Sequence, residues 1–191
     1  MNKNVPNILT MARVVLTPVF LLVFTIDSIP GHYMIALVIF AIASLTDLFD
    51  GKIARKYNLV SNFGKFMDPL ADKMLTTAAF LGLMANGYCN VWWVFLILFR
   101  EFGISSMRLI AAAEGVVIPA NMWGKVKTTI MMISVPLIMF LLFLQVDIAV
   151  LPASVPLVLI SNILVGICTA ATLISGIVYL IQGAKIIDFS K

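Results

Sequence analysis

Residues 47–72 read DLFDGKIARKYNLVSNFGKFMDPLAD, and the rest of the chain is organised around this stretch. Four of the nine acidic residues of the chain lie in it, although the segments on either side are apolar. An uncompensated charge is costly in hydrocarbon, so carboxylates between membrane-like segments need a partner. Divalent cations are the simplest partner for such a set. The four carboxylates are those of Asp47, Asp50, Asp68 and Asp72.

The composition is that of a membrane protein. Of the 191 residues, 62% are hydrophobic and only 12% are charged, against roughly a quarter charged in a soluble domain. The mean hydropathy is +1.08. We therefore expect an all-α integral membrane protein in which residues 1–191 form a single domain, with the lipid bilayer as its surroundings and no nucleic-acid partner.

Six segments reach the length of about 20 mostly apolar residues that a membrane-spanning helix needs. They are residues 8–26, 33–56, 63–87, 91–113, 121–146 and 155–182. Residues 4–13 are more polar, and we expect a short interfacial helix there before the first span. In it Asn7, Thr10 and Arg13 share one helical face, either as a helix cap with a basic anchor or as a binding face.

Lys and Arg residues decide the expected orientation, because they accumulate in cytoplasmic loops. With the N-terminus inside, the outer loops near residues 27–32, 85–90 and 147–153 contain no Lys or Arg. Ten cations then fall on the inner side. We therefore expect a multi-pass protein of the cell membrane with both termini, and the acidic stretch, facing the cytoplasm.

The spacing of the acidic stretch predicts two converging pairs of carboxylates. Asp47 and Asp50 are three residues apart, so they point the same way from a helix. Asp68 and Asp72 are four apart, and Gly64 is one turn earlier on the same face. A short connection makes the two helices antiparallel, which would bring both pairs to one point.

Carboxylate oxygens suit hard cations such as Mg²⁺, Mn²⁺ or Ca²⁺. Two-metal carboxylate sites clamp a phosphate or pyrophosphate, and one carboxylate can also act as general base. Arg55 and Lys65 flank the stretch and would neutralise further phosphate oxygens. The alternative is an ion-pair network that only locks the helices together, and four aspartates with this spacing argue against it.

The pattern Asp47-x-x-Asp50-Gly51-x-x-Ala54-Arg55, eight residues, Gly64-x-x-x-Asp68-x-x-x-Asp72 resembles the signature of the CDP-alcohol phosphatidyltransferase family without a departure. The resemblance extends over nearly the whole chain. It implies that the four aspartates hold two divalent metal ions, Mg²⁺ or Mn²⁺, which bind the pyrophosphate of a CDP-linked donor. It also implies a homodimer.

The resemblance further implies roles for individual residues. Asp72 would be the base that activates the acceptor hydroxyl. The small residues Gly51, Ala54 and Gly64 would make room for the cytidine. The N-terminal Pro6-Asn7-x-Leu9-Thr10-x-x-Arg13 also resembles the entry segment of the family, which makes Asn7 and Thr10 expected donor contacts.

The acceptor alcohol is not encoded in the aspartates, and the cations of the second half of the chain bear on it. Arg108, Lys125 and Lys127 exceed what a neutral alcohol requires and suit an acceptor that carries a phosphate; the alternative is plain membrane anchoring. The pattern REFGISSMR followed by GKVKT resembles the bacterial branch that makes phosphatidylglycerophosphate. The expected reaction transfers the phosphatidyl group of CDP-diacylglycerol to sn-glycerol 3-phosphate and releases CMP.

Arg100 and Glu101 lie deep in an apolar run, and their role is open between a functional pair and a packing pair. Glu101 is a candidate to compensate Arg100, although neighbours at i and i+1 do not face each other on a helix. In the last span, Gly166, Ser175 and Gly176 offer small residues for close helix contact.

Two other readings compete with the expected reaction. One is a family member that uses another acceptor, such as inositol phosphate, serine or phosphatidylglycerol. The other is a small ion transporter, which would need charges along a transbilayer route. The charges of this chain instead gather at one face, which favours the enzyme.

Overall fold

The structure of the protein is a computed structural model. It describes the backbone of residues 5–56, 62–113, 115 and 121–184, and the side chains of residues 7–46, 67, 70, 71, 73–113, 115 and 121–183. Predictions about the other residues and side chains lie outside the described part of the chain.

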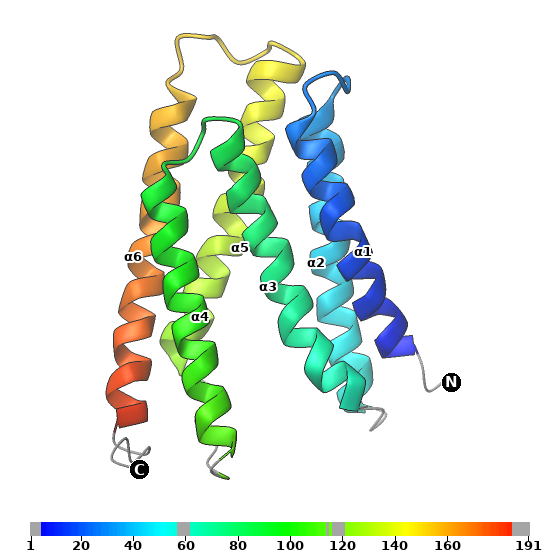
Figure 1. Ribbon diagram of the computed structural model, residues 1–191. Helices are drawn as coiled ribbons and strands as arrows, with labels where there is room; N and C mark the ends of the chain where they lie inside the picture. The colour runs from blue at the N-terminus through cyan, green and yellow to red at the C-terminus, as the bar shows by residue number, and fades with distance from the viewer. Residues whose placement is uncertain (1–4, 57–61, 114, 116–120, 185–191) are drawn as a thin grey trace. The chain divides into compact units, whose positions relative to one another are not determined.

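The described chain is helical, as expected, and its helices begin and end within a few residues of the predicted segments (Figure 1). They are α1 (Val5–Thr25), α2 (His32–Lys56), α3 (Asn62–Ala85), α4 (Val91–Ala113), α5 (Met122–Leu142), the π-helix η1 (Phe143–Asp147) and α6 (Leu157–Ala184). The fifth segment differs from expectation in its last turn, which continues α5 as the π-helix.

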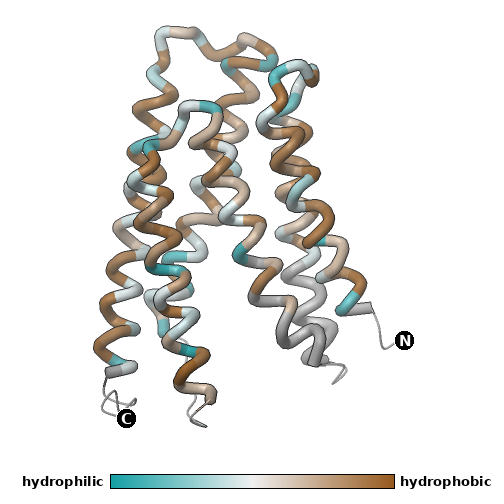
Figure 2. The backbone as a smooth tube through the Cα atoms, viewed as in Figure 1, coloured by the Kyte–Doolittle hydropathy of each residue, from teal (hydrophilic) through white to brown (hydrophobic). Residues whose placement is uncertain are grey.

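Among the described residues, three stretches are long and apolar enough to cross a membrane: Asn7–Thr25, Met122–Asp147 and Leu157–Gly183. Figure 2 shows hydrophobic residues along most of their length. Within the described side chains of α2 and α3, apolar stretches run over His32–Thr46 and Lys73–Ala85.

The separate interfacial helix expected at the N-terminus is wrong for residues 5–13, because α1 runs without a break from Val5 to Thr25. Proline is tolerated in a first helical turn, where the backbone N–H has no intrahelical acceptor. Pro6 therefore does not separate this segment from the helix. Pro18 lies inside α1 and does not end it either.

The helices fall into two compact units, which we describe one at a time. Unit 1 comprises residues 1–86 and 136–157, and unit 2 comprises residues 87–135 and 158–191. The division of α5 falls at Pro136, a residue without a backbone N–H. Unit 1 thus contains α1, α2, α3 and η1, and unit 2 contains α4, the first part of α5 and α6.

In unit 1, α1 packs along both α2 and α3, whereas α2 and α3 meet over only a short stretch of the described residues. Aromatic rings fill the contact. Phe20 stacks on Phe24 with ring centroids 5.4 Å apart and lies 5.8 Å from Phe40, and all three are fully buried or nearly so. Asn86 Nδ2 donates to the Phe24 carbonyl at 2.8 Å and ties the end of α3 to α1.

α3 approaches α1 closely at Gly82. A Cβ on this residue would lie 2.3 Å from Phe24 Cδ1, so the packing of the ring requires a residue without a side chain. Real Cβ contacts are never this short, and any larger residue would push the buried ring away.

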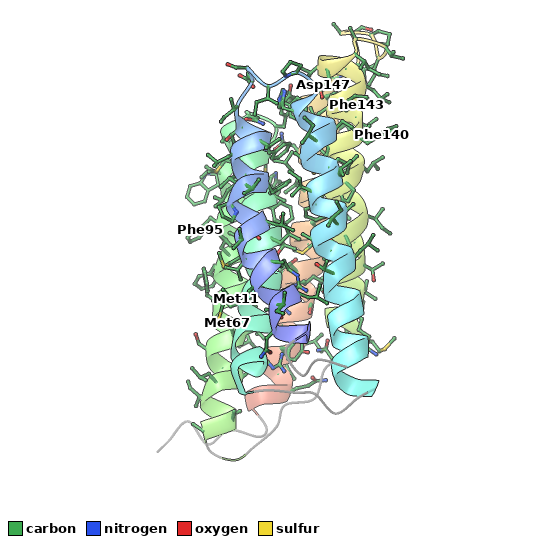
Figure 3. All side chains as sticks on the ribbon, turned by 90° about the vertical axis from the view of Figure 1, so that its right-hand side faces the viewer. Met11, Met67, Phe95, Phe140, Phe143 and Asp147 are labelled. Atoms are coloured by element: carbon green, nitrogen blue, oxygen red, sulfur yellow. The ribbon has the colours of Figure 1, made fainter. Side chains whose placement is uncertain are left out.

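Asp147, labelled in Figure 3 at the end of η1, connects η1 to the start of α2. Its Oδ2 accepts a hydrogen bond from the backbone N–H of Tyr33 at 3.1 Å. That N–H lies in the first turn of α2 and has no intrahelical acceptor. Oδ1 of the same carboxylate lies 3.4 Å from His32 Nδ1. One buried carboxylate therefore caps a helix and holds a buried histidine.

In unit 2, α6 packs along α4. Ile104, Met107, Ala111 and Tyr179 form a buried cluster. At Gly183 a Cβ would lie 2.7 Å from Met107 Sδ, so α6 approaches α4 closely here. At the other end of the pair, Asn90 N–H donates to Asn162 Oδ1 at 2.9 Å.

We predict that Gly82→Ala destabilises the protein by about 1–3 kcal/mol, because the new methyl group displaces the Phe24 ring from a filled core. Gly103→Ala is the matched control, since α4 has nothing within 4 Å of its Cβ position. It should be neutral or stabilise by up to about 1 kcal/mol, the helix-propensity difference. The unfolding free energies of detergent-solubilised Gly82→Ala and Gly103→Ala are compared with that of the wild type. Equal stability of the two variants would contradict the packing described for Gly82.

Candidate functional site

The four aspartates of the sequence motif lie on two helices of unit 1. Asp47 and Asp50 are in the last part of α2, and Asp68 and Asp72 are in the first part of α3. Figure 1 shows that the end of α2 and the start of α3 lie at the same end of this unit. Their predicted helical placement is thereby confirmed. Their side chains lie outside the described part, so the convergence of the carboxylates stays a prediction.

The predicted neighbours of the aspartates follow the same division. Gly51, Ala54 and Arg55 are on α2, and Gly64 and Lys65 are on α3. Met67, which is half-buried, marks this part of α3 in Figure 3, and Met11 marks the corresponding part of α1. The predicted roles of the five neighbours in donor binding also stay predictions. These neighbours are Gly51, Ala54, Arg55, Gly64 and Lys65.

The donor set fits a hard divalent cation. The four candidate ligands are carboxylates, which suit Mg²⁺ or Mn²⁺. His32 begins α2, whereas Asp47 comes 15 residues later, roughly 22 Å along the helix axis. The histidine is therefore too far away to add a nitrogen ligand. Among the described side chains, no group of three or more His, Cys, Asp or Glu residues offers another metal site.

α1 contributes a buried polar face to the same end of unit 1. Thr10 and Arg13 are 1% exposed, and Asn7 is half-buried. Arg13 Nε donates to the carbonyl of Ala43 at 3.3 Å, one helical turn before Asp47. A basic membrane anchor would be exposed, so Arg13 is not one. The face predicted from the i, i+3, i+6 spacing instead packs into the unit beside the acidic stretch.

The three predicted acceptor cations lie in unit 2 and differ in their surroundings. Arg108 is exposed two turns beyond Glu101 on α4, and Lys125 is exposed in the first turn of α5. Lys127 is half-buried, and its Nζ forms an ion pair with Glu101 Oε1. Lys127 therefore has a fixed protein partner.

Arg100 is the buried centre of this part of unit 2. Its side chain is 8% exposed, and it donates from Nη1 to Glu101 Oε1 at 2.9 Å and from Nη2 to Ser175 Oγ at 2.7 Å. The guanidinium carbon lies 5.7 Å from the centre of the Tyr179 ring, within reach of a cation–π interaction. A Cβ at Gly176 would lie 2.8 Å from Arg100 Cγ. The small residues expected to permit close contact on α6 do so here.

Glu101 pairs with Arg100, as one of the possibilities that the sequence left open predicts. Residues at i and i+1 diverge by about 100° around a helix, but both side chains are long enough to bend to a common point. Lys127 Nζ from α5 also contacts Glu101 Oε1, and Ser175 Oγ from α6 accepts a hydrogen bond from Arg100 Nη2. The pair is therefore held by contacts from two further helices, which the sequence spacing of Arg100 and Glu101 does not reveal.

Sequence reasoning missed the functional position of Tyr179. Its hydroxyl oxygen accepts a hydrogen bond from the backbone N–H of Asn121 at 3.2 Å. Asn121 Oδ1 in turn accepts a hydrogen bond from the backbone N–H of Gly124 at 2.7 Å. Asn121 thus caps the start of α5, and Tyr179 attaches that cap to α6. The spacing of Ser175 and Tyr179, i and i+4 on one helix, was the available signal. It indicated one face, but not that this face meets Arg100 and the start of α5.

An all-α membrane protein with aspartates on two successive helices and cations at the start of a later one defines a class of membrane-embedded enzymes, and the comparisons agree. The model of the CDP-alcohol phosphatidyltransferase family matches residues 3–178. The chain is 43% identical over 143 residues to a CDP-diacylglycerol–glycerol-3-phosphate 3-phosphatidyltransferase of Bacillus subtilis (strain 168), covering 69% of this chain and 74% of the relative.

Two further relatives extend this similarity. A probable phosphatidylglycerophosphate synthase of Mycobacterium tuberculosis (strain ATCC 25618 / H37Rv) is 37% identical over 186 residues, 95% of this chain and 82% of the relative. A CDP-diacylglycerol–glycerol-3-phosphate 3-phosphatidyltransferase of Rickettsia bellii (strain RML369-C) is 41% identical over 137 residues, 72% of this chain and 75% of the relative. The chain belongs to the CDP-alcohol phosphatidyltransferase family.

Proposed function

We propose that this protein transfers the phosphatidyl group of CDP-diacylglycerol to sn-glycerol 3-phosphate, forming phosphatidylglycerophosphate and CMP. The observation that carries the proposal is the similarity along 95% of the chain to a probable phosphatidylglycerophosphate synthase. Relatives named for the same donor and acceptor support it. The cations at the start of α5 and on α4 add the charge that a phosphorylated acceptor needs.

Asp47, Asp50, Asp68 and Asp72 would hold two divalent cations, Mg²⁺ or Mn²⁺. When bound, these ions neutralise the charge of the donor pyrophosphate. Arg55 and Lys65 supply further positive charge beside it, and Asn7 and Thr10 contact the nucleotide. The small residues Gly51, Ala54 and Gly64 leave space for the cytidine.

Asp72 acts as the general base. It takes the proton from the primary hydroxyl of glycerol 3-phosphate, and the oxygen forms a bond to the phosphorus that bears the diacylglycerol. The bond from that phosphorus to the oxygen of the CMP group breaks, and CMP leaves with the electron pair. Positioning and neutralisation of charge carry most of the rate enhancement, as in phosphoryl transfer generally.

The proposed setting is the cell membrane. Six helices span it, both termini face the cytoplasm, and the aspartates open to the cytoplasmic side, where glycerol 3-phosphate is dissolved. The proposal rests on the distribution of Lys and Arg residues, which avoid the predicted outer loops. Two copies of the chain form a homodimer.

We predict that the purified protein releases CMP from CDP-diacylglycerol in the presence of glycerol 3-phosphate. Inositol phosphate, serine and phosphatidylglycerol, tested in parallel, should give no more than the background release seen without an acceptor. Product identity is checked by mass spectrometry of the lipid fraction. Release with one of the other alcohols, and none with glycerol 3-phosphate, would reassign the acceptor while leaving the family intact.

Asp68→Asn and Asp72→Asn should each lower transfer by about a hundredfold or more, because a metal ligand or the base is lost. The amide has nearly the shape of the carboxyl group, so the variants should remain folded. EDTA should abolish the activity, and Mg²⁺ or Mn²⁺ should restore it.

Asp27→Asn is the matched control for the aspartate variants. Asp27 follows α1, its side chain is 88% exposed, and its contact with His32 is long at 3.8 Å. It should keep full activity. Full activity in Asp68→Asn and Asp72→Asn as well would refute the metal assignment.

Arg108→Ala and Lys125→Ala should each raise the KM for glycerol 3-phosphate by about tenfold, the loss of one charge-assisted contact. The KM for CDP-diacylglycerol should change by less than about twofold. Both side chains are exposed, so the stability of the protein should not change, and steady-state kinetics alone decide. An unchanged acceptor KM would assign these residues to membrane anchoring.

A further inference from the structure

Unit 2 contains a buried ion triad whose charges do not balance. Arg100 and Lys127 each carry a positive charge, and both contact the same oxygen, Oε1 of Glu101. The exposed fractions of the three side chains are 8%, 12% and 17%. Among the described side chains, two cations and one anion leave one positive charge in excess within the triad, and an anionic ligand would be attracted to it.

Arg100 is fixed so firmly that it provides a rigid base for Glu101. Ser175 and Tyr179 hold the guanidinium from α6, and the backbone at Gly176 lies directly against the aliphatic part of the side chain. Each of these contacts comes from one helix face. Glu101 therefore receives a hydrogen bond from a donor that has little freedom to move.

Lys127 gains its position from this arrangement. A lysine side chain has four flexible carbon–carbon bonds and loses about 2 kcal/mol of rotamer entropy when it is held in one place. Because Glu101 already holds the Lys127 side chain in the unliganded protein, less rotamer entropy is lost when a ligand binds. The ion pair with Glu101 also offsets the unfavourable desolvation of the ammonium group. An ammonium group has three N–H donors, so the Glu101 contact leaves two for another acceptor.

The other two predicted acceptor cations, Arg108 and Lys125, have no comparable support from the described side chains. Arg108 and Lys125 are exposed, and they suit the attraction of a charged ligand from solution. Lys127 is the cation whose direction is set in advance by a carboxylate. Of the three predicted acceptor cations, Arg108 and Lys125 are exposed, whereas Lys127 is held in place by the Glu101 carboxylate.

We infer that Glu101 is a positioning residue: held by Arg100, its carboxylate directs the Lys127 ammonium as the preset contact for the phosphate of the acceptor. The inference rests on the proposed function and adds to it the residue that orients one of its acceptor cations. Glu101 does not touch the acceptor in this scheme, and it acts through Lys127.

A double-mutant cycle tests the inference with the full-length purified enzyme, glycerol 3-phosphate and CDP-diacylglycerol. Glu101→Gln keeps the shape and the accepting oxygen but removes the charge. It should raise the acceptor KM by about five- to tenfold, with the donor KM changed by less than about twofold. In a Lys127→Met background the same substitution should have no further effect on the acceptor KM. Glu101→Asp, which restores the charge, should recover the acceptor KM to within about threefold.

Asp147→Asn is the matched control, because it also removes a buried carboxylate that contacts a basic side chain, but in unit 1. It should lower thermal stability without changing the acceptor KM. If Glu101→Gln does not accumulate as folded protein, the cycle is run with Glu101→Asp and Lys127→Met, and a small rise in KM that vanishes in the Lys127→Met background supports the inference.

Three results would overturn the inference: equal effects of Glu101→Gln with and without Lys127, parallel changes in both KM values, or a lower acceptor KM in Glu101→Gln, which would make the carboxylate a competitor of the phosphate. Failure of the proposed function is separate, since the wild-type enzyme would then release no CMP with glycerol 3-phosphate.

Discussion

The structure depends on how charge is accommodated in a chain that is 62% hydrophobic. Burying a charged side chain is unfavourable unless it is paired and hydrogen-bonded. Arg100 meets this requirement through Glu101, Ser175 and Tyr179, which come from its own helix and from α6. Arg13 meets part of it through the carbonyl of Ala43 on α2. In each unit, compensating one buried guanidinium determines which helix faces must meet.

The same constraint connects the fold to the chemistry of phosphate. A membrane enzyme that handles a pyrophosphate and a phosphorylated alcohol must keep charges near apolar helices without neutralising all of them. The triad of Arg100, Glu101 and Lys127 keeps one positive charge in excess. The aspartates at the end of α2 and the start of α3 are the residues that we propose hold divalent cations, which suit carboxylate ligands. The excess charge of the triad is what we propose attracts the phosphate of the acceptor.

Particular residues show how far sequence reasoning reached. Apolar length located α4 at Val91–Ala113, as expected, because spans of this length have few alternatives. Spacing also placed Thr10 and Arg13 on one face of α1. It did not predict that this face is buried, nor that Lys127 and Ser175 join the pair of Arg100 and Glu101. Both depend on a neighbouring helix from a distant part of the chain, and no local pattern encodes that neighbour.

The sequence by itself determined that the protein is a helical membrane protein, that it belongs to its family, and that its aspartates occupy α2 and α3. Apolar length and gapped motifs are properties of the chain read along one dimension. Only the tertiary structure decided which cations are preset and which are free. Lys125 and Lys127 are two residues apart on α5, and their sequence surroundings are alike. Because a helix turns by about 100° per residue, the Lys125 side chain is exposed whereas that of Lys127 meets Glu101.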